Sequence, residues 1–225
     1  MNKMLRNCLF GLMLALLVVS VAAAQDNFVK GGVAGVSGLH GQPVLPPTAI
    51  FTNCGTGCTS YNTGSGYYVS GTALTAGASQ TLAMGFSAAK ATKFVKALSP
   101  NTVYTSNGGA STGKMSAYLL KGSATTGPTT KLANLVQNGK IPDYPSIKVV
   151  KYTLKKGAKP VTFKAGATYF LCETEPVADV QLLWMLSNSD VTSPFWFQDQ
   201  DSCTAKGLTW LNATGAVDGA AFEMN

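Results

Sequence analysis

Cysteine is the residue type with the most reactive chemistry in this 225-residue chain, and four of its five cysteines form two groups. Cys54 and Cys58 have three residues between them in the stretch TNCGTGCTS (52–60), and Cys172 and Cys203 are 31 positions apart. A thioredoxin-like redox pair has two intervening residues, and a four-cysteine zinc site usually has two close pairs. We therefore predict two disulfides. Of the three pairings that four cysteines allow, we favour 54–58 with 172–203.

Carboxylate pairs are the second candidate chemistry. Glu173 and Glu175 in CETE are two residues apart, so they share one face of an expected strand. Glycosidases need two carboxyls about 5 to 9 Å apart beside a cleft, and any i, i+2 pair meets that distance, so the spacing alone does not favour a hydrolase. Asp199 and Asp201 in FQDQDSC could donate oxygens to a structural calcium ion. Because Ca²⁺ takes six to eight oxygens, we favour solvated turn carboxylates there.

No other catalytic pattern is present in the sequence. His40 is the only histidine and has no obvious partner, and no nucleophile elbow, H-E-x-x-H helix or P-loop occurs. We therefore predict a protein that is not an enzyme and has no cofactor and no metal centre.

Exposed aromatic rings are the third candidate chemistry, since flat rings can stack on the apolar faces of sugars. The candidates are Tyr61, Tyr67, Tyr68 and Trp196. In FWF (195–197), a strand would place the middle ring opposite its neighbours, so either Trp196 or the two phenylalanines face outward. The alternative is that these rings belong to the core. We assign Trp184 and Trp210 to the core.

The N-terminal sequence MNKMLRNCLFGLMLALLVVSVAAAQ predicts an exported protein. It has a basic start (Lys3 and Arg6), an apolar stretch and a small-residue cleavage site before Gln25. We predict a signal peptide over residues 1–24, a secreted, extracellular or periplasmic location, and no transmembrane segment after cleavage. An oxidising compartment agrees with the predicted disulfides.

Charge and composition narrow the class of partner. Without Lys3 and Arg6 the net charge is +5, and no arginine remains. Residues 26–172 hold 14 lysines and two acids, whereas residues 173–225 hold one lysine and eight acids. A nucleic-acid reader would use arginine for bidentate contacts, so we predict no nucleic-acid partner. Solubility explains a scattered lysine surface, and weak attachment to an anionic envelope polymer is the functional alternative.

Short apolar segments separated by turn residues predict an all-β fold. We expect an antiparallel β-sandwich, jelly-roll-like, of about ten to twelve strands in a single domain over residues 66–225, preceded by a Gly/Pro-rich leader over 25–65. LLWML is apolar on both faces and predicts a central strand. The two prolines of IPDYP (141–145) predict a connection, and KLANLVQNG (131–139) fits either a strand or a short helical turn. The expected strands are GYYVS (66–70), SQTLAMGFSA (79–88), ATKFVKALS (91–99), MSAYLLKG (115–122), SIKVVKYTL (146–154), PVTF (160–163), ATYFLCETE (167–175), DVQLLWMLS (179–187), PFWFQD (194–199), LTWLN (208–212) and AAFEM (220–224).

Several of these segments resemble the secreted bacterial jelly-roll domains found among carbohydrate-binding modules and cell-surface accessory domains. The matching positions in residues 149–173 are Val161, Phe163, Ala165, Gly166, Thr168, Tyr169 and Leu171. MGFSAAKATKFVKALS (84–99), MSAYLLKG and the terminal LTWLNATGAVDGAAFEMN are similar to other strands of that pattern. The resemblance implies a jelly-roll architecture more than a function, because many such domains have no assigned activity.

Two functions fit these expectations. The first is a non-enzymatic secreted protein that binds a surface polymer or glycan through exposed aromatic rings. The alternative is a structural extracellular protein, in which the low content of charged residues and the disulfides favour durability or self-association. A hydrolase would need a cleft that the sequence does not indicate.

Overall fold

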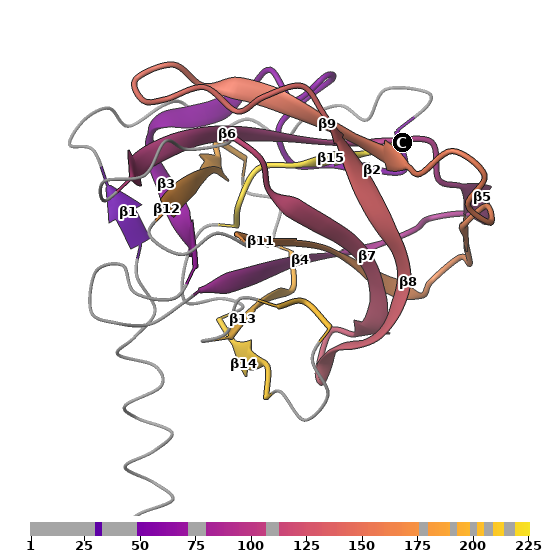
Figure 1. Cartoon of the computed structure of the whole chain (residues 1–225). Helices are drawn as coiled ribbons and strands as arrows, with labels where there is room; N and C mark the ends of the chain where they lie inside the picture. The colour runs from indigo at the N-terminus through magenta and orange to yellow at the C-terminus, as the bar shows by residue number, and fades with distance from the viewer. Residues whose placement is uncertain are drawn as a thin grey trace, which may run out of the picture.

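The computed structural model describes residues 30–32, 49–71, 80–106, 113–175, 180–189, 193–198, 202–204, 209–213 and 219–225. These residues form an all-β, antiparallel structure (Figure 1). The strands are β1 (Lys30–Gly32), β2 (Phe51–Thr52), β3 (Tyr61–Ser70), β4 (Thr81–Ser87), β5 (Thr92–Lys93), β6 (Ala97–Ser106), β7 (Ser116–Ser123), β8 (Gly127–Asn138), β9 (Lys148–Leu154), β10 (Thr162–Phe163), β11 (Thr168–Thr174), β12 (Val180–Ser187), β13 (Phe195–Gln198), β14 (Leu211–Asn212) and β15 (Glu223–Met224).

The long strands form two stacked layers. One layer has the order β3-β12-β6-β9, and the other has the order β4-β11-β7-β8. With the eight long strands numbered in chain order, the layers read 1-8-3-6 and 2-7-4-5, the strand order of a jelly roll with its two Greek keys. The β8–β9 hairpin joins the layers along one edge (Figure 1). At the opposite edge the described parts of β3 and β4 form no ladder, and an isolated bridge links Ser70 at the end of β3 to Gln80 before β4. The predicted sandwich is confirmed.

The main core lies between the two layers, as the alternation of side chains requires. Tyr67, Trp184 and Phe222 are fully buried there, and the Trp184 Nε1 donates a hydrogen bond to the Ala221 carbonyl at 2.7 Å. Strand β12 lies between β3 and β6 and is buried on both faces, which confirms that LLWML forms a central strand.

A second, smaller core covers the outer face of the β4-β11-β7 layer. One register row crosses four strands there and contains Trp196, Ala83, Cys172 and Tyr118. The small side chains of Ala83 and Cys172 leave room for the indole of Trp196, which is buried. The disulfide from Cys172 to Cys203 fixes residues 202–204 at this face.

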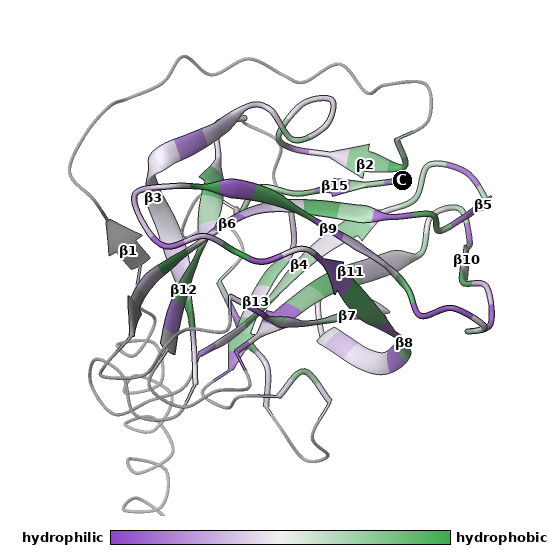
Figure 2. Ribbon diagram, turned by 45° about the horizontal axis from the view of Figure 1, so that its top comes forward, coloured by the Kyte–Doolittle hydropathy of each residue, from purple (hydrophilic) through white to green (hydrophobic). Residues whose placement is uncertain are grey.

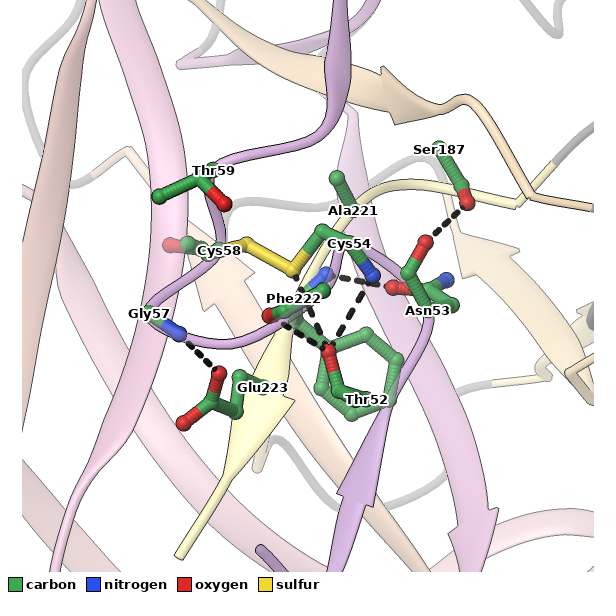
Figure 3. The surroundings of a disulfide bond; sticks show 12 residues. Thr52, Asn53, Cys54, Gly57, Cys58, Thr59, Ser187, Ala221, Phe222 and Glu223 are labelled. Atoms are coloured by element: carbon green, nitrogen blue, oxygen red, sulfur yellow. Dashed lines mark hydrogen bonds between the residues drawn. A yellow bond between two sulfur atoms is a disulfide. The ribbon is translucent and has the colours of Figure 1, made fainter. Parts of the chain in front are cut away.

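The second disulfide joins Cys54 to Cys58, so both favoured pairings are present. Its loop is bound to the C-terminal segment (Figure 3). Asn53 Oδ1 accepts the Phe222 N–H at 2.7 Å, and Glu223 Oε2 accepts the Gly57 N–H at 2.6 Å. Both sulfurs are buried, so this pair is a structural staple that ties residues 52–58 to residues 220–223.

Three local expectations need correction. The sheet begins before residue 66, since β3 starts at Tyr61 and the predicted leader contributes β1 and β2. The segment ATKFVKALS is divided between β5 and β6, because the chain leaves the β5–β10 pair after Phe94, and residues 95 and 96 bond to Asn225. KLANLVQNG is part of a strand, β8. Among the described residues, no helix has the length and hydropathy needed to cross a bilayer.

Gly127 is expected to be the least replaceable glycine of the second core. Its φ is +74°, and a Cβ there would lie 2.8 Å from the Trp196 ring. Gly127→Ala combines a left-handed backbone with overpacking, so we expect a loss of about 3 kcal/mol in unfolding free energy. Gly157→Ala is the matched control, because its φ is +82° and nothing lies within 4 Å. It should cost about 1 kcal/mol. Equal losses in urea titrations would contradict the packing argument.

Candidate functional site

The four aromatic candidates from the sequence have different environments. Tyr67 is fully buried, with its ring centroid 4.8 Å from that of Phe195, and Trp196 is buried in the second core. Neither ring lies where a sugar could stack, which corrects the expected exposure of both. Tyr61 and Tyr68 are partly exposed. Tyr61 packs beside the Cys54–Cys58 staple, so Tyr68 is the remaining candidate on an open sheet face.

Tyr68 belongs to a row of three tyrosines on the outer face of the β3-β12-β6 layer. Its ring centroid is 5.6 Å from that of Tyr104, and the Tyr104 centroid is 5.8 Å from that of Tyr144. Tyr104 and Tyr144 are exposed by 37% and 38%, the highest values among the described aromatic residues. Burial, together with the neighbouring Tyr104 hydroxyl, raises the pKa of Tyr68. We call Tyr68, Tyr104 and Tyr144 the tyrosine platform.

The chain folds back on itself to build this platform. A register shift in the β6–β12 pairing between Gln181 and Leu182 leaves Tyr104 without an opposite residue in β12. The connection between β8 and β9 then docks against β6, where the Tyr144 N–H donates to the Val103 carbonyl at 2.8 Å. The Tyr144–Pro145 peptide bond is cis. Two segments 40 positions apart thus place their rings side by side.

A second constellation lies inside the sandwich. Glu173 on β11 is fully buried, and its Oε1 accepts a hydrogen bond of 2.6 Å from the Ser99 hydroxyl on β6. The Asn101 side chain donates to the same hydroxyl at 2.7 Å. Glu173 Oε2 and Asn101 Oδ1 have no protein hydrogen-bond partner. Tyr152 on β9 is also fully buried, and its hydroxyl donates to Met115 Sδ at 3.9 Å.

Burial dominates the electrostatics of this cluster. Loss of hydration raises the pKa of Glu173 from 4.5 to about 8, although Ser99, Tyr152 and Asn101 favour the ionised form. Burial also raises the pKa of Tyr152, and the nearby carboxyls of Glu173 and Glu175 add to that increase. Glu173 is therefore a buried acid that is largely neutral at pH 7.

The two glutamates differ from the carboxyl pair of a glycosidase. Glu173 and Glu175 are 0% and 1% exposed, whereas a glycosidase presents its carboxyls to a substrate cleft. The candidate calcium ligands Asp199 and Asp201, like His40, lie outside the described residues. Within the described ranges, no group of three or more His, Cys, Asp or Glu side chains could hold a metal ion.

Comparison with known proteins gives no match: no protein family, no curated protein and no solved structure is significantly similar to this chain.

Proposed function

We propose that this chain is a secreted, non-enzymatic jelly-roll protein that binds glycan through the tyrosine platform. The observation that supports this proposal is the exposed row of three rings on one sheet face. Rings on a sheet and on a loop docked to it lose little conformational freedom on binding, so their contact area contributes efficiently to affinity.

The chemistry of the platform suits sugars. Each ring offers an apolar face, and each phenolic hydroxyl can donate and accept a hydrogen bond at the ring edge. The spacing of the three rings favours an oligosaccharide over a single sugar, because adjacent centroids are separated by nearly 6 Å. The resemblance to carbohydrate-binding modules supports the same ligand class.

Removal of either exposed ring is expected to weaken this binding. Tyr104→Ala and Tyr144→Ala should each weaken the affinity for the best ligand of a glycan array about tenfold, since aromatic anchors typically contribute 1 to 2 kcal/mol or more. Tyr118→Ala is the control, because Tyr118 is a partly exposed tyrosine on the opposite layer. Titration calorimetry measures all three.

Binding of no saccharide by the purified protein would contradict the proposal. Equal losses in Tyr104→Ala and Tyr118→Ala would also contradict it, because the loss would then reflect general destabilisation. Thermal unfolding of each variant separates lost folding from lost contact.

A further inference from the structure

Seven lysines gather at one end of the sandwich, around the short β5–β10 pair. We call this group the lysine end: Lys90, Lys93, Lys96, Lys155, Lys156, Lys159 and Lys164. All are exposed except Lys96, which is partly exposed. Figure 2 shows hydrophilic colour on the loops at β5 and β10. Of the four acids in the described parts of the chain, Glu173, Glu175 and Glu223 are buried. The fourth, Asp143, lies in the β8–β9 connection.

Backbone hydrogen bonds hold these lysines on a fixed support. Gly166 N–H donates to the Ala88 carbonyl at 2.9 Å, and Phe94 N–H donates to the Val161 carbonyl at 2.9 Å. Within the longest lysine loop, Ala158 N–H donates to the Lys155 carbonyl at 2.9 Å. The connection after β10 is therefore bonded to the connection after β4, and the connection after β9 is bonded to the residue that follows β5.

Aromatic packing beneath the lysine end makes the support rigid. The Phe163 ring is fully buried and lies 4.6 Å from the Tyr169 ring and 5.3 Å from the Phe86 ring, measured between centroids. The backbone that carries the lysines is thus packed against aromatic residues of the main core. Clustered like charges repel one another, and no described acid lies between these lysines. Binding of a polyanion would relieve this repulsion, so the charge pattern favours a polyanionic ligand.

We infer that the lysine end binds a linear polyanionic polysaccharide, a function separate from the tyrosine platform. Lysine ammonium groups act as point charges that tolerate varied spacing of sulfate or carboxylate groups. Nucleic acid is the less suitable polyanion, because the only arginine in the chain is Arg6 and none of the described residues at this end exposes an aromatic ring for base stacking.

Charge-neutralising variants test the location of this site. The triple variant Lys155→Gln, Lys156→Gln, Lys159→Gln should weaken binding to dextran sulfate at least tenfold. The control triple variant Lys114→Gln, Lys140→Gln, Lys148→Gln removes the same charge around the start of β9, whose seven residues span roughly 20 Å. It should change the affinity less than threefold. Wild-type affinity should fall at least tenfold between 50 and 200 mM salt, because binding releases counterions.

The remaining measurements assign the ligand class. Neutral dextran should not bind, and single-stranded DNA and phosphatidylglycerol vesicles should bind at least tenfold more weakly than dextran sulfate at equal charge concentration. Equal losses in the two triple variants would overturn the site, since binding would then follow net charge alone. DNA or vesicles that bind as tightly as dextran sulfate would overturn the polysaccharide assignment. Circular dichroism confirms that both variants are folded.

Discussion

The stability advantage of Glu173→Gln over the wild type is expected to grow by about 5 kcal/mol between pH 4 and pH 9. The pKa of Glu173 is about 8 in the folded protein against 4.5 as its ordinary value. The folded state therefore keeps a proton that the unfolded state releases above pH 4.5. The Glu173 contribution to stability is complete below pH 4.5, falls from there to pH 8, and is constant at higher pH.

Urea titrations of both proteins across this pH range measure the effect. Near pH 4 the two should differ by at most about 2 kcal/mol, because glutamine replaces a protonated carboxyl of similar shape but adds an amide donor. At pH 9 the variant should be the more stable protein. Parallel stability curves would show that Glu173 does not titrate as a buried acid.

Tyr152→Phe is the complementary variant. The Tyr152 hydroxyl lowers the pKa of Glu173, so its removal should raise that pKa further and extend the fall in stability beyond pH 8. The other side chains that lower the pKa of Glu173 are the neutral Ser99 and Asn101. A Tyr152→Phe curve that levels off at a lower pH than the wild-type curve would contradict the assigned direction.

Most of the strands were predictable from sequence because each depends on local alternation. The burial of β12 follows from LLWML, and the disulfides were predicted from the number and spacing of the cysteines. Alternation also predicted that Trp196 faces away from Phe195 and Phe197, which is confirmed. Trp196 does face outward from the main core, but it is buried because residues 202–204, fixed by a long-range disulfide, pack on the same outer face.

The tyrosine platform and the buried acid were not predictable in the same way. Tyr144 belongs to IPDYP, which reads as a connection, and its ring meets Tyr104 only because the loop docks on β6. Glu173 did carry a usable signal. It follows Tyr169 and Leu171 at alternate positions of β11, so it occupies an inward-facing site of the strand. Its partner on β6 depends on the stacking of the two layers, which single-sequence patterns do not specify.

Removal of the Cys172–Cys203 disulfide should cost about 4 kcal/mol, against about 2 kcal/mol for Cys54–Cys58. In the chain-entropy description, the cost rises with the length of the closed loop, and the separations are 31 and 4 residues. The double variants Cys172→Ala/Cys203→Ala and Cys54→Ala/Cys58→Ala form a matched pair, because each removes two buried sulfurs.

The two bridges also differ in what else holds their segments. The Cys54–Cys58 loop keeps the hydrogen bonds of Asn53 with Phe222 and of Gly57 with Glu223 when the sulfurs are gone. The segment around Cys203 has fewer such anchors among the described residues, the clearest being the bond from Gln198 Nε2 to the Ser202 carbonyl. Loss of the Cys172–Cys203 disulfide should therefore also loosen residues 202–204, which cover Trp196.

Urea unfolding measures the free energy of unfolding of each double variant, and tryptophan emission reports whether Trp196 is still shielded from water. The long-bridge variant should show a red-shifted native emission, because Trp196 gains contact with water, whereas the short-bridge variant should keep the wild-type spectrum. Replacing Trp196 with Phe in both backgrounds assigns the shift to that ring. A larger stability loss from the short bridge would show that local hydrogen bonds, and not loop length, determine the contribution of each disulfide.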